Sequence, residues 1–230
     1  MRCDDTIDAL ISRLDQQFRK NRNDTKARAM SDYMKGLFPF FGIASVERKI
    51  IQKAWFNTFD STDRTLFWKL IHTLWDQNER EFQYVAIDLL NKQPRKCYNG
   101  LDAKEIESLI TTKSWWDTVD LIASNYLGKY MLYFPELGKN LIHAWRNSDN
   151  LWLQRSCLIF QLKYGNKTDV ALLKSLIQQY SGISEFFIQK AIGWSLRQLS
   201  KTNSIAVEEI LEDITLKGIA LREARKHLQE

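Results

Sequence analysis

Residues that end helices are scarce in this chain of 230 residues, which contains only 9 Gly and 3 Pro. A β-rich domain needs many tight turns, and tight turns use glycine and proline. Apolar residues instead recur three and four positions apart, as in Ile7, Leu10, Ile11, Leu14 and Phe18. This spacing aligns them along one side of an α-helix. The sequence therefore predicts an all-α fold of many short helices.

Helix starts are indicated by hydroxyl residues that can accept a hydrogen bond from the first turn. Such positions occur in Ser45-Val46-Glu47, Ser61-Thr62-Asp63, Thr168-Asp169 and Ser184-Glu185. No linker rich in Gly, Pro or Ser divides the chain, so we expect a single domain over residues 1–230. Consecutive helices with short connections pack as antiparallel neighbours, and the pattern alone leaves a bundle and a curved solenoid open.

The charge balance favours an acidic partner. There are 33 Lys and Arg residues against 28 Asp and Glu, a net charge of +5. Such an excess suits nucleic acid, although other soluble proteins also reach it. Two basic clusters, in residues 19–28 and 92–96, either contact phosphates or are solvated surface.

Several kinds of site and location are not indicated. Cys3, Cys97 and Cys157 lie far apart, so we expect neither a disulfide framework nor a zinc site. Phosphate loops, dinucleotide fingerprints and nucleophile elbows are missing, so we expect no cofactor. The first 13 residues carry acids where a signal peptide would be apolar, and no apolar run could span a membrane. We therefore expect a cytoplasmic protein without membrane contact.

The segment 114–122 contains a candidate reactive carboxylate. Trp116 and Asp120 are four residues apart and so lie along one edge of a helix, while Trp115 belongs to its apolar stripe. An indole one turn from a carboxylate partly removes that carboxylate from water. The alternative is that Trp116 is core and Asp120 a solvated edge residue. Asp117, on the outer face, is expected to be a helix-start residue.

Two later segments contain further candidates. Arg155 lies within an apolar stripe, so its burial would require a carboxylate or phosphate partner, unless its head reaches water along a half-buried stem. Trp194 projects away from the apolar face of its segment, between Lys190 and Arg197. An indole on a basic face either contacts a nucleotide or packs against the next helix pair. We expect Lys190 and Arg197 to contact nucleic acid beside it.

Four blocks together resemble the DNA alkylation repair family of HEAT-like-repeat DNA glycosylases. They are Tyr33–Ile43 with Glu47-Arg48, Ser114–Asp120, Leu151–Arg155 and Ala191–Arg197. The blocks occur in the order of the family and span nearly the whole chain. One departure is Ala44, where a longer polar side chain is expected, which puts a minor DNA contact in doubt.

The resemblance implies a right-handed superhelical solenoid whose concave basic face binds duplex DNA. It implies hydrolysis of the N-glycosidic bond of N3-methyladenine and N7-methylguanine, by a monomer without a cofactor. Asp120 corresponds to the family's catalytic aspartate. Arg155, its partner, would anchor Asp120 or hold a flanking phosphate. Trp116, Trp194 and Tyr33 correspond to aromatic residues of the lesion site. The main alternative is a non-catalytic HEAT-like scaffold that binds DNA or protein.

Overall fold

The computed structural model describes residues 3–56 and 62–228, and within these ranges all regular secondary structure is helical. The all-α prediction is therefore confirmed. The helices form two compact units, residues 1–98 and 99–230, and the expectation of one domain stays a prediction. No helix in the described ranges is long and apolar enough to cross a membrane.

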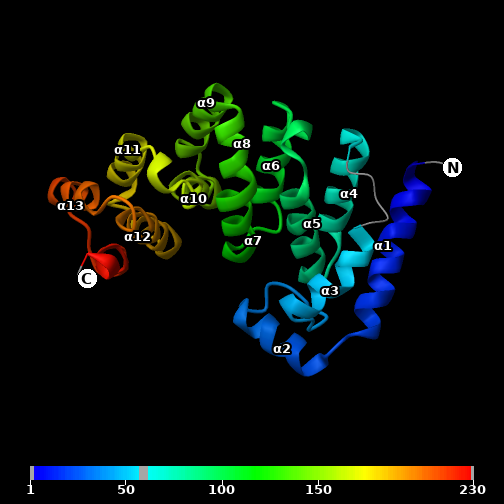
Figure 1. Ribbon diagram of the computed structural model, residues 1–230. Helices are drawn as coiled ribbons and strands as arrows, with labels where there is room; N and C mark the ends of the chain where they lie inside the picture. Colours follow the sequence, from blue (N-terminus) through cyan, green and yellow to red (C-terminus); the bar gives the residue numbers. More distant parts are fainter. Residues whose placement is uncertain (1–2, 57–61, 229–230) are drawn as a thin grey trace. The chain divides into compact units, whose positions relative to one another are not determined.

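The N-terminal unit is a stack of helices (Figure 1). They are α1 (Cys3–Lys20), α2 (Asp24–Tyr33), α3 (Ser45–Phe56), α4 (Arg64–Asp76) and α5 (Arg80–Lys92), followed by a 3-10 turn at Arg95–Cys97. Helix α1 packs against α3 and α4, and α4 packs against α5. The stripe predicted from Ile7 to Phe18 is buried on α1, where each of its apolar residues is at most 8% exposed. Burial of this stripe attaches α1 to its neighbours.

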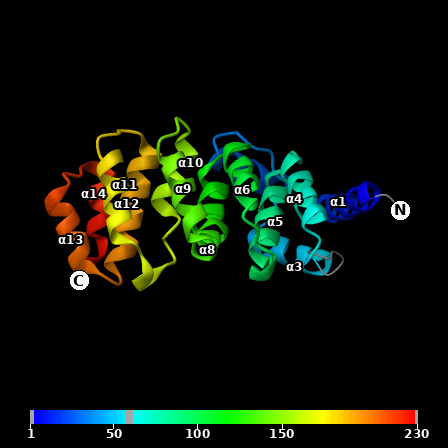
Figure 2. The same ribbon diagram turned by 90° about the horizontal axis from the view of Figure 1, so that it is seen from above.

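The C-terminal unit contains the remaining helices. They are α6 (Asp102–Thr111), α7 (Trp116–Leu121), α8 (Gly128–Tyr133), α9 (Pro135–Arg146), α10 (Leu151–Ile159), α11 (Val170–Tyr180), α12 (Phe186–Ser200), α13 (Ser204–Asp213) and α14 (Gly218–Ala224). Helix α10 packs against α11 and α12, and α12 packs in turn against α13 and α14. Figures 1 and 2 show these pairs following one another along the unit. Successive stacked pairs are the arrangement of a solenoid of helical repeats rather than of a closed bundle.

The predicted helix starts are close to the observed ones, but the capping residue differs. Asp63, Asp169 and Glu185 each accept a hydrogen bond from a backbone N–H in the first turn of α4, α11 and α12. The hydroxyl residues before them do not act as the caps that we predicted, because the acid that follows occupies the capping position. Ser45 is the first residue of α3, and Ser61 lies outside the described residues.

Candidate active site

Helix α7, which carries Asp120, continues through a π-helical stretch, Ile122–Leu127, into α8. The Ser124 hydroxyl donates to the Asp120 carbonyl oxygen at 2.6 Å at the start of this stretch. Gly128 follows it, and a Cβ there would lie 2.6 Å from the carbonyl oxygen of Phe160, the residue directly after α10. Glycine therefore allows the α7–α8 helix and α10 to pack closely.

The first turn of α7 differs from the prediction. Trp115 has extended backbone dihedral angles and precedes the helix, so its assignment to the helical apolar stripe is wrong. Its ring packs instead against Trp152 and Phe187, at centroid distances of 5.7 and 5.2 Å. Asp117 lies in the first turn as predicted, but it is only 7% exposed rather than on an outer face. Neighbouring helices cover this turn, which local spacing alone does not reveal.

Asp120 and Arg155 form a buried, bidentate ion pair. The Arg155 Nε donates to Asp120 Oδ1 and its Nη2 donates to Oδ2, each at 2.7 Å. The two residues are 9% and 3% exposed, so Asp120 is not the solvated edge residue of the alternative interpretation. Burial of an arginine requires such a partner, and the parallel two-bond geometry is the strong form of this contact. Of the two roles considered for Arg155, the structure shows the anchoring of Asp120.

Arg155 also reaches the beginning of α12. Its Nη1 donates to the backbone carbonyl of Phe187, and its Cζ lies 5.9 Å from the centroid of the Phe187 ring. The guanidinium thus connects α7, α10 and α12. Trp194 lies about two turns further along α12. Trp116 and Trp194 are both partly exposed.

The surroundings of Asp120 make its carboxylate poorly solvated. Burial raises the pKa of Asp120 more than the hydrogen bonds and charge of Arg155 lower it, and the nearby Asp117 carboxylate adds to the rise. The Asp120 side chain keeps 12% of its surface exposed, so one edge remains accessible. A fixed and weakly hydrated carboxylate is well suited to stabilise positive charge that develops close to it.

The basic residues of α12 are held by a side chain that the sequence did not indicate. Lys190 Nζ donates to Glu223 Oε1 at 3.0 Å, and Arg197 Nη1 donates to Glu223 Oε2 at 2.8 Å. Glu223 belongs to α14 and is 3% exposed. The Asp120–Arg155 and Lys190–Glu223 contacts span 35 and 33 residues of the chain. Each pair joins a carboxylate on one helix of the stack to a cation on another.

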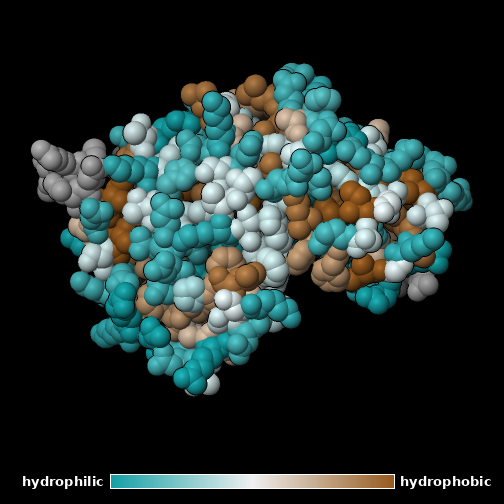
Figure 3. Space-filling view, turned by 180° about the vertical axis from the view of Figure 1, so that it is seen from behind, coloured by the Kyte–Doolittle hydropathy of each residue, from teal (hydrophilic) through white to brown (hydrophobic). Residues whose placement is uncertain are grey.

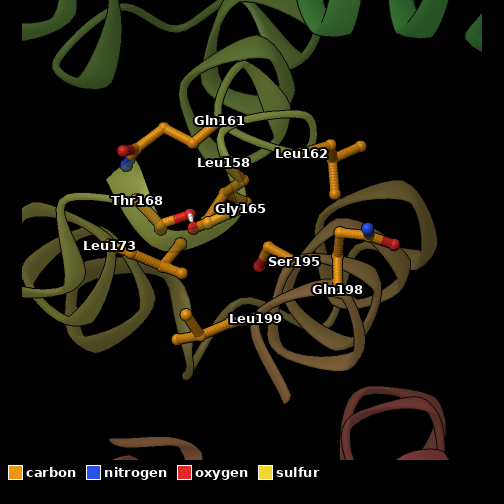
Figure 4. Close-up of a pocket in the computed structure, with 9 residues that line it drawn as sticks. All are labelled: Leu158, Gln161, Leu162, Gly165, Thr168, Leu173, Ser195, Gln198 and Leu199. Atoms are coloured by element: carbon orange, nitrogen blue, oxygen red, sulfur yellow. Dashed lines mark hydrogen bonds between the residues drawn. The ribbon is translucent and has the colours of Figure 1, made fainter. Parts of the chain in front are cut away.

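One small cavity of the C-terminal unit lies between α10, α11 and α12. The cavity in Figure 4 is lined by residues of α10, α11, α12 and the loop after α10, namely Leu158, Gln161, Leu162, Gly165, Thr168, Leu173, Ser195, Gln198 and Leu199. Its volume of about 10 Å³ has room for roughly one water molecule, so it does not hold a nucleobase. Within the described ranges, no group of three or more His, Cys, Asp or Glu side chains is arranged to hold a metal ion.

Comparison with known proteins identifies the family of the chain. The family model described as DNA alkylation repair enzyme matches residues 14–228. The chain belongs to the DNA alkylation repair enzyme family. A solved structure described as "Predicted DNA alkylation repair enzyme from Enterococcus faecalis" is 34% identical to it, with a TM-score of 0.83. The match covers 91% of this chain and 97% of the other. No curated protein sequence matches this member of the family.

The N-terminal block of this DNA alkylation repair family member begins with an exposed aromatic residue. Tyr33 ends α2 and is 67% exposed. Leu37, Val46 and Ile50 in the following loop and α3 are also exposed, by 52, 72 and 70%. Figure 3 shows apolar surface over this part of the N-terminal unit. The contact of Tyr33 with a lesion stays a prediction.

A buried carboxylate, that of Glu81, holds the loop in the same block in place. Glu81 on α5 accepts hydrogen bonds from the backbone N–H groups of Phe41, Gly42 and Ile43, at 2.9 to 3.1 Å. Gly42 has a φ of +83°, and a Cβ there would lie 2.1 Å from the carbonyl oxygen of Asn23. The path of the loop therefore requires glycine at position 42 of the family block.

The early basic cluster is largely balanced by nearby acids. Arg19 pairs with Asp15 and Arg22 with Asp24, each at 2.6 Å, and both arginine side chains are exposed. In the later cluster, Lys92 Nζ lies 5.0 Å from the centroid of the Phe56 ring on α3. Contacts of either cluster with phosphate stay a prediction.

Proposed function

We propose that the protein is a DNA glycosylase that removes cationic alkylated purines, N3-methyladenine and N7-methylguanine, from duplex DNA. The observation that carries this proposal is the Asp120–Arg155 pair. It holds one carboxylate in a poorly hydrated position with an accessible edge, one helical turn from Trp116. Membership of the family supports the DNA substrate and the repair role.

The chemistry follows from the charge of the substrate. Alkylation at N3 or N7 makes the purine a cation, so the base leaves as a neutral molecule when the bond between C1′ and the base nitrogen breaks. The bonding electron pair goes to the base, and the sugar becomes oxocarbenium-like. Asp120 stabilises this positive charge, and a water oxygen then bonds to C1′ and loses a proton, for which the carboxylate is a suitable acceptor. Arg155 keeps the carboxylate in place throughout.

Aromatic residues supply the selectivity in this proposal. Trp116 and Trp194 are partly exposed and carry indole rings, whose faces attract cations. An attraction of this kind distinguishes a cationic purine from a neutral base without hydrogen bonds to a flipped-out base, and so without the cost of full extrusion from the helix.

Release of free base from methylated duplex DNA tests the proposal. Wild-type protein is incubated in excess with DNA that contains N7-methylguanine, and the released base is quantified by chromatography. Binding to undamaged duplex is measured in parallel. Base release supports the glycosylase, whereas binding to DNA without any base release would favour the non-catalytic scaffold.

A further inference from the structure

Three cations meet on one buried carboxylate where α14 packs against α12. Glu223 Oε1 accepts hydrogen bonds from Lys190 Nζ at 3.0 Å and from Lys226 Nζ at 2.9 Å. Its Oε2 accepts one from Arg197 Nη1 at 2.8 Å. These four residues are called the Glu223 cluster below.

The packing of the two helices fixes the position of the cluster. A Cβ at Gly193 would lie 2.6 Å from the Cβ of Glu223 and 2.8 Å from the carbonyl oxygen of Ala220, so only glycine allows α14 to approach this closely.

Burial alone would raise the pKa of Glu223, but the hydrogen bonds and charges of Lys226 and Lys190 outweigh it and lower the pKa to about 2. Glu223 is therefore ionised at neutral pH.

The cluster carries more positive than negative charge. Three cations share a single carboxylate, and their side chains are 39, 29 and 47% exposed for Lys190, Arg197 and Lys226. The two ammonium nitrogens contact the same oxygen, so they lie at most about 6 Å apart and repel each other. Each cation uses only one of its N–H groups on Glu223, which leaves donors for a second anion.

We propose that the Glu223 cluster binds a phosphate group of the DNA backbone beside Trp194. This inference rests on the proposed function only for the identity of the ligand, duplex DNA. Arg155 already donates to Asp120 and Phe187 and its side chain is only 3% exposed, so a phosphate near the site needs other cations. Lys190 and Arg197 are on the same helix as Trp194, and Lys226 adds a third donor from the segment after α14. Two ammonium groups and a guanidinium are the usual donors to phosphate oxygens.

The test measures binding of the full-length protein to an undamaged duplex by fluorescence anisotropy over a series of salt concentrations. Lys226→Gln removes one cation of the cluster. It should reduce the steepness of the log–log salt dependence by about 0.9 and weaken binding about eightfold at 0.1 M salt. Lys139→Gln is the matched control, because Lys139 is an exposed lysine on α9 that also pairs with a single glutamate, Glu136 at 2.8 Å. The control should leave the salt dependence unchanged.

The outcomes separate a specific phosphate site from a general effect of charge. Lys226→Arg should keep the wild-type salt dependence. Lys190→Gln should reduce the salt dependence as Lys226→Gln does, and it replaces Lys226→Gln in the test if Lys226→Gln is unstable. An unchanged slope in both glutamine variants of the cluster would overturn the proposal, and so would an equal reduction in the Lys139 control. Because the measurement uses undamaged DNA, its result does not depend on base release, and failure of the glycosylase proposal is distinguishable from failure of this one.

Discussion

Replacement of Asp120 by asparagine keeps the size of the side chain and removes its charge. Arg155 is 3% exposed, so the variant leaves a buried guanidinium with an amide that can accept only part of its hydrogen bonds. Loss of one partner of a buried ion pair costs about 3–5 kcal/mol. We expect a cost near the lower limit of this range, because Arg155 can still donate to the amide oxygen that replaces a carboxylate oxygen of Asp120 and to the Phe187 carbonyl. A loss of about 3 kcal/mol corresponds to a fall in Tm of roughly 6–12 °C.

The effect of Asp120→Asn on catalysis should be larger than its effect on folding. A neutral amide cannot stabilise an oxocarbenium-like sugar as a carboxylate does, and loss of a comparable stabilising group lowers rates by about 100- to 1000-fold. We expect single-turnover release of N7-methylguanine to fall by at least about 100-fold, while affinity for undamaged duplex is retained. Asp213→Asn is the control, because Asp213 is exposed and pairs with Lys174 at the surface. It should leave base release unchanged.

A double variant separates the two effects. In Asp120→Asn with Arg155→Met, neither charge remains, and the new methionine lies beside the ring of Phe187. Removal of both charges leaves no uncompensated guanidinium in the buried site, so Tm should recover by at least half of its loss. Base release should stay low. Near-normal release by the single variant, or recovery of release together with Tm in the double variant, would refute the role of the Asp120 charge.

Three further predictions concern the arginine, the lesion and the acid stability. Arg155→Lys should restore only part of the base release lost in Arg155→Ala, because an ammonium lacks the two-bond fork. Since Arg155 lowers the pKa of Asp120, the acid limb of the pH–rate profile should also move to higher pH in both variants. In matched duplexes, N7-methylguanine and N3-methyladenine should be released at least about 100-fold faster than uracil and hypoxanthine, because a base that is already cationic leaves without being protonated; comparable rates would contradict this. The pKa of Glu223 is lowered from 4.5 to about 2, so its contribution to stability is present above pH 4.5 and is lost as the pH falls toward 2. Glu223→Gln should remove this part of the pH dependence in denaturant unfolding, and an unchanged acid profile would show that the cluster does not stabilise the fold.

Local spacing in the sequence was sufficient to predict the helices and several residues of the site. The scarcity of glycine and proline and the three- and four-residue apolar period indicated an all-α chain, because these features act within a single helix. The same reasoning placed Trp116 and Asp120 on one helix and required a partner for Arg155. It was wrong for Trp115 and Asp117, because the start of α7 and the cover over its first turn depend on neighbouring helices.

Contacts between distant residues were decided only by the tertiary structure. The residue pattern alone gave Arg155 only a need for an anion, and the family resemblance named Asp120 as its partner; the contact itself, across 35 residues, is made by the packing of α7 against α10. Gly128 permits the close approach of the α7–α8 helix to α10, and Gly193 permits that of α12 to α14. In the sequence, neither glycine can be told from one that only weakens a helix. Glu223 was not indicated at all, because a glutamate on a short helix is ordinarily solvated. Helical periodicity specifies which side of a helix is apolar, whereas the helix that covers that side, and the charges that it brings, follow from the packing of the stack.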